Sequence, residues 1–353
     1  MVKVKQVTKV LVIDDSALVR ALLTEIIDSD SRLSVVATAS DPYEARELIK
    51  QHSPDVLTLD IEMPKMNGIA FLKNLMRLRP MPVLMISTLT QEGAPATLEA
   101  LELGAVDFVP KPQGEGTGAL ERYRDDIIEK LLAARQANIH SNDAGAEKKE
   151  VGPKLSAPRG RRISPRFLCA IGASTGGTEA IKAVVSALPK DSPPIVITQH
   201  IPEAFSASFA QRVNASSKVE VCEATHNQYI EKGCVYIAPG HSHLRIIQKG
   251  GSYVCTLDKK EPVNRHRPSV SVLFDSVAEC AGEHALGVLL TGMGADGADA
   301  LLRLRQLGAM TIAQDEASSV VWGMPGAAVK LDAAQKVLPL KKIPGSIISY
   351  AYN

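Results

Sequence analysis

The sequence of 353 residues predicts two α/β domains, each built on a doubly wound parallel sheet. Short runs rich in Val, Leu and Ile alternate with amphipathic segments in both halves of the chain. This alternation is typical of parallel strands that are buried on both faces and covered by helices. Between the halves the hydrophobic periodicity stops, and small residues, prolines and basic residues replace it. The length also fits two domains, at about 100 to 200 residues per domain.

The domain boundaries follow from where the periodicity stops and resumes. We expect the first domain over residues 7–130, a linker over 131–165 and the second domain over 166–353. The composition of the middle segment is typical of a linker. Its excess of basic side chains would suit an acidic partner, although charged runs are usually only solvated.

The first domain is expected to contain five strand-and-helix units. Ser16 can cap the first helix, because its hydroxyl can accept a hydrogen bond from the first turn. One apolar face of that helix is expected to carry Leu18, Leu22, Leu23, Ile26 and Ile27. The five strands are expected in the runs KVLVID, SVVATAS, DVLTLDI, PVLMIS and VDFVPK.

The second domain repeats this alternation. Its strands are expected in the runs FLCAIGAS, PIVITQH, VEVCEAT, ALGVLLTG and MTIAQDE. Between Cys234 and Leu257 the residues alternate and glycines are frequent, which indicates an added antiparallel hairpin. The second domain is therefore also α/β, with a mostly parallel sheet.

Composition argues against several classes of protein. The formal net charge is +1, so no global basic field exists for binding nucleic acid. No apolar run approaches the ~18 residues of a membrane span, and the N-terminal residues do not resemble a signal peptide. The five cysteines are an odd number and form no Cys-x-x-Cys pair, which disfavours a disulfide framework or a zinc knuckle. We expect a cytoplasmic protein without direct membrane insertion.

Charged side chains follow several strands of the first domain. Asp14 and Asp15 end the first strand, Asp60 the third, Ser87 the fourth and Lys111 the fifth. Ligands of open α/β sheets lie at these strand ends, and three carboxylates at one edge repel one another unless a divalent cation such as Mg²⁺ lies among them. Each aspartate alone could simply cap the next helix.

This constellation resembles the receiver domain of two-component response regulators, with its (βα)5 fold. The resemblance implies that Asp60 accepts a phosphoryl group and that Asp15 and Asp60 hold Mg²⁺, helped by Asp14 and the carbonyl of Glu62. It also implies that Lys111 contacts the phosphate. Ser87 would be the switching hydroxyl and Phe108 the aromatic side chain that changes rotamer. Phosphorylation would add roughly 1.5 to 2 negative charges at Asp60.

In the second domain, residues 172–176 read Gly-Ala-Ser-Thr-Gly and fit the G-x-S-x-G nucleophile elbow. The hydroxyl of Ser174 would lie beside the positive end of the next helix, which favours a developing oxyanion. His200 ends the next strand and is the best-placed base. His241 and His243 form a His-x-His pair, but no acidic or cysteine partner stands at zinc-ligand spacing. The remaining histidines, His266 among them, show no functional pattern.

A third glycine-rich turn allows two interpretations. It places Asp296 where a carboxylate could orient His200. The same turn carries a dinucleotide fingerprint, because Gly292, Gly294 and Gly297 precede a helix and Asp315 follows the next strand. Against nucleotide binding, Asp296 would place a negative charge beside the pyrophosphate.

Together, GASTGG, TQH, RHRPSVSVLFDS and TGMGADGA behind a receiver and a linker resemble the chemotaxis response regulator protein-glutamate methylesterases, the CheB family. The resemblance covers nearly the whole chain. It implies Ser174 as nucleophile, His200 as general base and acid, and Asp296 as the orienting carboxylate. The order Ser, His, Asp differs from the Ser, Asp, His order of α/β-hydrolases, so a separate doubly wound esterase fold is expected.

The implied activity is hydrolysis of glutamyl γ-methyl esters on methyl-accepting chemoreceptors, with release of methanol, together with deamidation of receptor glutamines. A chemotaxis histidine kinase would be the phosphodonor, and the ester hydrolysis would need no cofactor. Backbone amides near Thr175 and Met293 are candidate oxyanion donors, and Arg265, Arg267 and Ser269 are candidate lining residues of a substrate groove.

Three other functions stay open at this point. A DNA-binding output would need a basic recognition helix, which does not stand out in the second domain. A receiver-controlled dehydrogenase would use the turn at Gly292. An esterase acting on another acyl substrate is the closest chemical alternative.

Overall fold

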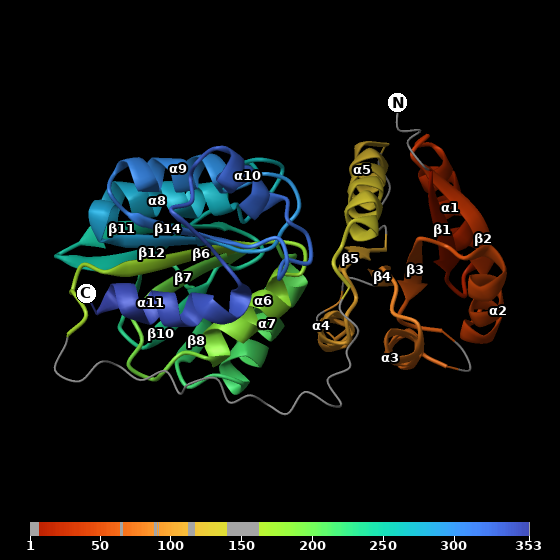
Figure 1. The fold of residues 1–353 in the computed structure, drawn as a ribbon, viewed down its shortest axis with the longest axis horizontal. Helices are drawn as coiled ribbons and strands as arrows, with labels where there is room; N and C mark the ends of the chain where they lie inside the picture. The colour runs from red at the N-terminus through yellow and green to blue at the C-terminus, as the bar shows by residue number, and fades with distance from the viewer. Residues whose placement is uncertain are drawn as a thin grey trace. The chain divides into compact units, whose positions relative to one another are not determined.

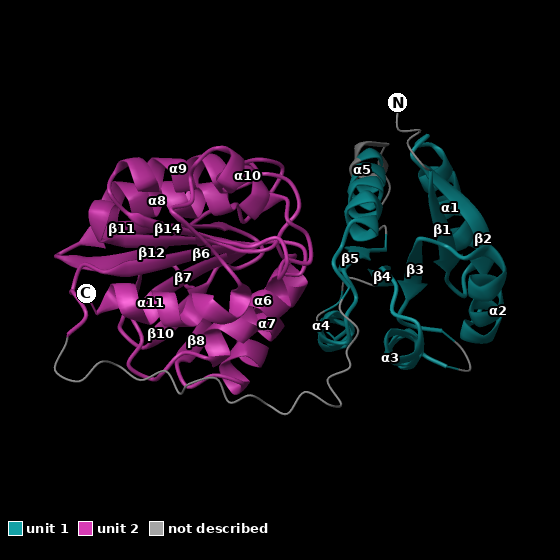
Figure 2. Ribbon diagram, in the orientation of Figure 1, with its two compact units in different colours: residues 1–149 teal, residues 150–353 magenta. Residues whose placement is uncertain are grey.

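The computed structural model describes residues 7–63, 66–87, 90, 92–111, 117–139 and 162–352. The chain divides into two compact units, residues 1–149 and 150–353 (Figure 2). Most of the predicted linker, residues 140–161, lies outside the described residues.

The first unit is a five-stranded parallel sheet with helices on both faces (Figure 1). Its strands follow the spatial order β2-β1-β3-β4-β5. They are β1 (Thr8–Ile13), β2 (Leu33–Ala39), β3 (Val56–Asp60), β4 (Val83–Ser87) and β5 (Asp107–Pro110). The helices are α1 (Ala17–Asp28), α2 (Pro42–His52), α3 (Gly68–Leu78), α4 (Ala94–Glu102) and α5 (Thr117–Arg135). Helix α1 packs against α5, and α3 packs against α4. The order of the strands reverses beside β1 and β3, which is where such sheets bind ligands.

Helix α5 extends beyond the predicted domain boundary at residue 130. It ends at Arg135, so the predicted linker begins inside this helix. Leu131 and Ala134 are fully buried, which makes the last turns part of the first unit.

Helix α1 corrects one sequence prediction. Ser16 caps the helix, accepting a hydrogen bond from the amide of Val19. The buried stripe, however, consists of Leu23, Ile26 and Ile27, whereas Leu18 is 79% exposed. Leu18 was predicted to lie on the apolar face, but it belongs to the first turn, before the buried stripe begins.

The second unit contains a seven-stranded parallel sheet in the order β15-β14-β13-β6-β7-β10-β8. Its strands are β6 (Leu168–Ala173), β7 (Ile195–Gln199), β8 (Glu220–Glu223), β10 (Cys234–Ile237), β13 (Ala285–Leu289), β14 (Met310–Gln314) and β15 (Lys336–Leu338). Strand β6 lies at the centre, with β7 on one side and β13 on the other. The chain turns from one half of the sheet to the other at this centre.

Helices cover both faces of this sheet (Figure 1). One layer consists of α6 (Gly177–Ser186), α7 (Glu203–Ala215) and α11 (Ile343–Ala351). The other consists of α8 (Val270–Ala281), α9 (Ala298–Gln306) and α10 (Met324–Lys330). Two short 3-10 helices, η1 (Gly282–His284) and η2 (Leu340–Lys342), complete the unit.

A small antiparallel sheet contains the predicted hairpin. Strands β11 (His243–Lys249) and β12 (Ser252–Asp258) pair antiparallel, and β9 (Gln228–Tyr229) pairs with β12. Strand β11 packs against α8. The hairpin is confirmed, but the segment Cys234–Ile237 at the start of the predicted region is a strand of the parallel sheet.

Close packing of α8 on β6 brings the start of this helix beside the end of the strand. A Cβ atom at Gly172 would lie 2.2 Å from Cγ1 of Val270, the first residue of α8. Only glycine permits this approach, since real Cβ atoms do not come so near. The N-terminus of α8 is thereby placed at the carboxyl edge of the sheet.

None of the helices within the described residues is both long enough and apolar enough to cross a membrane.

The burial of α1 leads to a first prediction. Leu23→Ala should lower the free energy of unfolding of the first unit by about 2 to 5 kcal/mol, because Leu23 is fully buried. Leu18→Ala, the matched control, should change it by less than about 0.5 kcal/mol. Denaturant unfolding checks both values, and equal losses in the two variants would contradict this packing.

Candidate active site and phosphorylation pocket

Three neighbouring strands bring the predicted catalytic residues together. Ser174 follows β6, His200 follows β7, and Asp296 lies between β13 and α9. Because β6 is paired with both β7 and β13, the three residues meet at one edge of the parallel sheet.

The three side chains form a hydrogen-bonded chain. Nδ1 of His200 lies 3.0 Å from Oγ of Ser174, and Nε2 lies 2.8 Å from Oδ2 of Asp296. A carboxylate accepts only, so Nε2 carries the proton and donates it to Asp296. Nδ1 is then free to accept the hydroxyl proton of Ser174, which is the geometry of a serine nucleophile with its base.

The turn around Ser174 is held by hydrogen bonds to the backbone of Ser174. Its carbonyl accepts hydrogen bonds from the amide of Gly177 at 2.6 Å and from Nε2 of Gln199 at 2.9 Å, and its amide donates to the carbonyl of Thr291. Gly176 has a φ of 73°, in the left-handed region, and a Cβ there would also collide with Val320. The sharp turn therefore requires glycine at this position.

Asp296 is buried among hydrogen-bond donors. Its carboxylate accepts hydrogen bonds from Nδ2 of Asn264 (2.7 Å), Oγ of Ser269 (2.9 Å), the amide of Val270 (2.6 Å) and Oγ of Ser271 (2.7 Å), besides His200. Most of these donors lie in the first turn of α8, whose positive end also favours a negative charge.

These donors determine the charge state of Asp296. Burial by itself would raise the pKa of the carboxyl group, but hydrogen bonds from His200, Asn264 and Ser271 hold it well below its usual value. Asp296 is therefore ionised throughout the neutral range, as the orienting member of such a triad must be.

The residues predicted to line a substrate groove or to bind the oxyanion have the following surroundings in the structure. Ser269 was predicted to line a substrate groove, but it is fully buried and bonds Asp296 instead. Arg267 is exposed, and its guanidinium donates to the carbonyls of Lys259 and Lys260. Thr175 is buried and Met293 is half-buried, beside the serine turn and the Gly292 turn respectively.

Sequence reasoning missed several residues of the site. The ring of His266 stacks on that of His200, with 3.6 Å between the ring centroids. Asn264 and Ser271 bond Asp296, and Gln199 bonds the serine turn. His266 and Ser271 lie inside the RHRPSVSV segment and Gln199 inside TQH, which carry the family resemblance, but no spacing rule gives these residues or Asn264 a role.

Zinc binding by the His-x-His pair finds no support. His243 is buried, accepts a hydrogen bond at Nδ1 from the amide of Ser269, and bonds the carbonyl of Glu261 through Nε2. Nδ1 of His241 lies 2.6 Å from Oγ of Ser242. Within the described part of the chain, the only group of three potential metal-binding side chains lies in the first unit.

The glycines of the dinucleotide-like motif serve close packing. A Cβ at Gly292 would lie 2.8 Å from Cβ of Ser174, and one at Gly297 would lie 2.5 Å from Cγ1 of Val270. Asp315, the predicted ribose ligand, accepts hydrogen bonds from the amide and hydroxyl of Ser318. The geometry therefore favours the catalytic interpretation of this turn.

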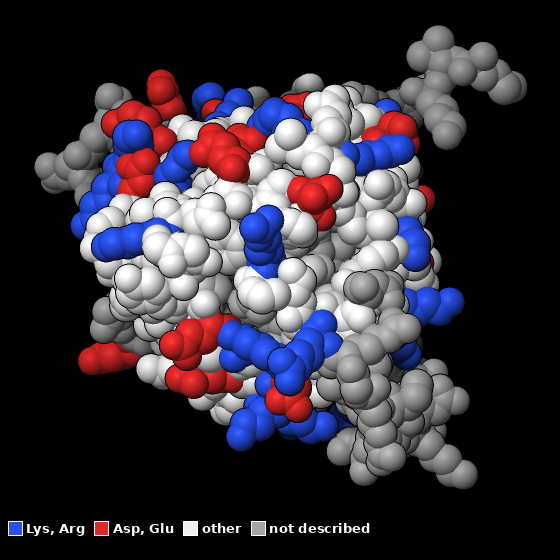
Figure 3. Space-filling model, turned by 90° about the vertical axis from the view of Figure 1, so that its left-hand side faces the viewer, with Lys and Arg blue, Asp and Glu red and all other residues white. Residues whose placement is uncertain are grey.

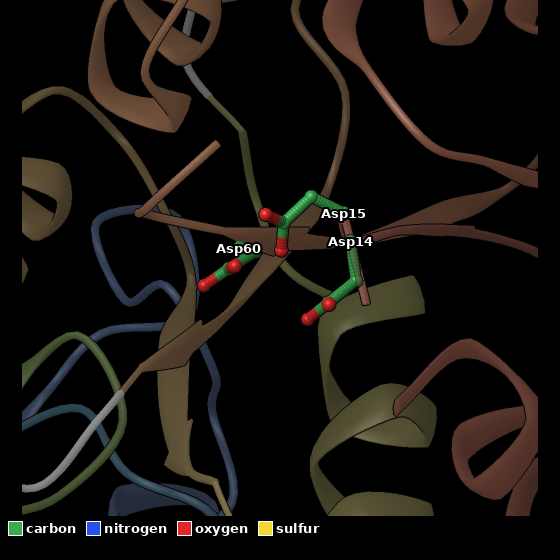
Figure 4. Close-up of side chains that lie close together, drawn as sticks. All are labelled: Asp14, Asp15 and Asp60. Atoms are coloured by element: carbon green, nitrogen blue, oxygen red, sulfur yellow. The ribbon is translucent and has the colours of Figure 1, made fainter. Parts of the chain in front are cut away.

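In the first unit, the predicted acidic pocket forms at the ends of β1 and β3. Carboxylate oxygens of Asp14, Asp15 and Asp60 lie within 4.8 Å of one another (Figure 4). Nζ of Lys111, just after β5, lies 2.8 Å from Oδ2 of Asp60 and 3.1 Å from Oδ2 of Asp14. All four predicted charged residues thus meet at one place.

The pocket suits a divalent cation. Burial and the charge of Asp14 raise the pKa of Asp60 to about 6, although Lys111 and the amide of Glu62 act in the opposite direction. Oδ2 of Asp14 is buried, and the ammonium of Lys111, 3.1 Å away, is its partner. Closely spaced oxygen ligands with excess negative charge are what Mg²⁺ binds.

The predicted switch residues lie beside this pocket. Ser87 is buried, and its hydroxyl lies 2.9 Å from that of Thr97 on α4, a contact that the sequence did not indicate. Phe108 is buried, and Lys130 of α5 donates to its carbonyl at 2.7 Å. A movement of Ser87 toward Asp60 would therefore break its hydrogen bond to Thr97 on α4.

The ionisation of Asp296 predicts a pH dependence. A lowered pKa means that Asp296 stabilises the fold above the ordinary carboxyl pKa of about 3.9, and that this contribution is lost as the pH falls below it. In Asp296→Asn this pH-dependent stabilisation is absent. The NH₂ group of the new asparagine side chain must then face hydrogen-bond donors. We expect the difference in unfolding free energy between wild type and variant to shrink from pH 5 to pH 3. A difference independent of pH would contradict this assignment.

The acidic pocket predicts an effect of Mg²⁺ on stability. Because the raised pKa of Asp60 reflects an unfavourable charge, Asp60→Asn should raise the melting temperature of the first unit at pH 7 without divalent cations. Adding Mg²⁺ should raise the melting temperature of the wild type more than that of the variant. Calorimetry in EDTA and in MgCl₂ measures both, with Asp28→Asn, on α1, as the control.

Comparison with known proteins agrees with both units. Family models described as CheB methylesterase and as response regulator receiver domain match residues 169–347 and 10–119. A protein of Saccharophagus degradans named protein-glutamate methylesterase/protein-glutamine glutaminase 2 is 64% identical over 343 residues, which is 97% of this chain and 98% of the relative. A protein of Hahella chejuensis named protein-glutamate methylesterase/protein-glutamine glutaminase 1 is 54% identical, covering 97% of this chain and 96% of the relative.

The second unit is similar to a solved structure. The CheB methylesterase catalytic domain of Thermotoga maritima is 38% identical, with a TM-score of 0.51, and the match covers 52% of this chain and 97% of that one. The two-domain fold class and the family predicted from the sequence are thus confirmed. The chain belongs to the CheB methylesterase family and carries a receiver domain ahead of the hydrolase domain.

Proposed function

We propose that this protein is a phosphorylation-activated methylesterase that hydrolyses glutamyl γ-methyl esters on chemoreceptors and deamidates receptor glutamines. The observation that carries the proposal is the chain of hydrogen bonds from Ser174 through His200 to Asp296. The names of the relatives from Saccharophagus and Hahella support the same two reactions.

The reaction follows from this geometry. Oγ of Ser174 attacks the ester carbonyl while Nδ1 of His200 takes the hydroxyl proton. Asp296 accepts the hydrogen bond from Nε2 and stabilises the imidazolium. His200 then returns the proton to the departing methoxide, so that methanol leaves and an acyl-serine remains. Water, deprotonated by His200, hydrolyses the acyl-serine to free glutamate. With a glutamine side chain the leaving group is ammonia.

The oxyanion formed in each step needs donors. We assign this role to the backbone amides of Thr175 and Met293. Thr175 lies one residue after the nucleophile, where the positive end of α6 begins. A Cβ at Gly292 would lie 2.8 Å from Cβ of Ser174, and this closeness supports the next residue, Met293, as the second donor. Each such donor is worth about 100-fold to 1000-fold in kcat in serine hydrolases.

The substrate would approach over exposed basic side chains. Lys259, Lys260 and Arg265 lie in the exposed loop between β12 and α8, and the Arg267 guanidinium donates to the carbonyls of Lys259 and Lys260 in the same loop. An acidic helical region of a chemoreceptor would complement them. On the face drawn in Figure 3, basic and acidic side chains intermingle, and this face does not suit a nucleic acid.

The receiver unit supplies the regulation. Asp60 is the phosphoryl acceptor, and a chemotaxis histidine kinase is the donor. Asp15, Asp60 and the carbonyl of Glu62 would hold Mg²⁺, with help from Asp14. When bound, the ion neutralises charge on the phosphoryl group during transfer. Lys111 and the hydroxyl of Ser87 then bond the phosphate, and Ser87 gives up its contact with Thr97.

A cytoplasmic location fits the cysteines. All five are free, and burial raises the pKa of Cys255 and of Cys280 to about 12, so these thiols stay protonated and inert.

Methanol release tests the catalytic assignment. Ser174→Ala should reduce methanol release from methylated chemoreceptor membranes to background, a loss of at least about 10⁴-fold, because nothing replaces the nucleophile. Ser186→Ala on α6 is the matched control and should remain active. If the wild type releases no methanol from these membranes but cleaves other esters through Ser174, the chain is an esterase for another acyl substrate.

Phosphorylation tests the regulatory assignment. A small-molecule phosphodonor with Mg²⁺ should raise the rate of methanol release from the wild type, whereas Asp60→Asn should keep only the basal rate. EDTA should abolish the increase in the wild type, because the acidic pocket then lacks its cation. If the phosphodonor still raised methanol release by Asp60→Asn, this result would contradict Asp60 as the phosphoryl acceptor.

A further inference from the structure

The ring of His266 lies flat against the catalytic imidazole. The centroids of His266 and His200 are 3.6 Å apart and their planes differ by 16°. His266 has no part in the reaction steps above. A stacked ring presents its face rather than its nitrogen atoms, so no proton passes directly between the two imidazoles.

The stacking restricts a motion that the triad leaves free. His200 is held by hydrogen bonds at both ring nitrogens, to Ser174 and to Asp296. Both bonds lie near the ring plane, so the ring can tilt about the line through its two nitrogens with little change in either distance. Tilting nevertheless weakens both bonds, because their strength depends on the angle at the donor and acceptor. A flat ring at van der Waals distance opposes tilting toward that side.

A tight backbone turn places His266 there. Val263 and His266 exchange two backbone hydrogen bonds, of 3.1 and 3.0 Å. The two residues between them, Asn264 and Arg265, have φ values of 52° and 68°. Two consecutive left-handed residues inside such a pair define a type I′ turn, in which glycine is usually preferred at the second position. Arg265 is therefore held in a strained conformation.

The same turn also contacts the other partner of His200. Nδ2 of Asn264 donates to Oδ1 of Asp296 at 2.7 Å and to Oγ of Ser271 at 3.1 Å. One four-residue turn thus touches both members of the His200–Asp296 pair. Strain in non-glycine residues is concentrated where the surrounding structure needs a particular geometry.

We propose that His266 is a positioning residue for the hydrolysis, holding the ring of His200 in the plane that aligns Nδ1 with Oγ of Ser174. This role rests on the proposed function. The side chain of His200 is only 8% exposed. By covering one face, His266 also keeps water from that face, and hydrogen bonds are stronger where water is excluded.

The test compares a variant of His266 that lacks an aromatic ring with one that keeps a flat ring. His266→Ala should lower kcat for methanol release by about 100-fold, because misalignment of a catalytic group has that scale of effect, while KM stays near the wild-type value. His266→Phe keeps a flat ring without nitrogens and should recover most of kcat. His284→Ala, at the 3-10 helix η1, is the control for loss of a partly exposed histidine. Melting temperatures verify that each variant is folded.

A spectroscopic measurement follows the ring independently of turnover. In protein labelled with ¹⁵N-histidine, the proton on Nε2 of His200 should give a low-field NMR signal, because it is bonded to Asp296. We expect this signal to persist in His266→Phe and to broaden or disappear in His266→Ala.

The outcomes distinguish the positioning role of His266 from the proposed function. A His266→Ala enzyme with normal kcat, a loss confined to KM, or a His266→Phe enzyme as slow as His266→Ala would overturn the positioning role. If the wild type releases no methanol, the proposed function fails. The NMR signal then decides about His266 alone, because an unchanged signal in His266→Ala shows that the stack does not hold the ring.

Discussion

The catalytic end of this protein depends on one buried carboxylate. Asp296 is charged and 4% exposed, which is costly unless donors replace the lost water. Its donors come from the Asn264 turn and from the start of α8, and they are in place because α8 packs directly on the glycine of β6. Through His200, this cluster determines the orientation of the imidazole and the atom that can accept the proton of Ser174.

The two acidic sites of the chain illustrate opposite solutions to buried charge. Asp296 is surrounded by donors, so its pKa is lowered and its charge is permanent. Asp60 has two carboxylates beside it and one lysine, so its pKa is raised to about 6. The first arrangement is complete and suits a rigid catalytic site. The second carries excess negative charge, so a bound cation or a transferred phosphoryl group changes its electrostatic energy, which is what a switch requires.

Close approach of backbones explains why the glycine motifs of the second unit are ambiguous in the sequence. Gly172, Gly292 and Gly297 each lack room for a side chain, since Val270, Ser174 or Met324 occupies the space. Nucleotide-binding turns need glycine for a similar steric reason, with a phosphate in place of a side chain. The motif records the close contact but does not identify the contacting group.

The sequence by itself determined the five strands of the first unit, five of the seven parallel strands of the second and the residues at their ends, because runs of buried aliphatic residues and the carboxyl-edge rule are local signals. It therefore identified Asp14, Asp60 and Lys111 in one unit and Ser174 and His200 in the other. Tertiary structure alone decided that Leu18 is exposed, that Ser269 binds Asp296 and that His266 stacks on His200. The physical reason is that Ser269 and His266 lie in or just after an irregular loop. The conformation of this loop is set by contacts with residues far away in the chain, and no periodicity records such contacts.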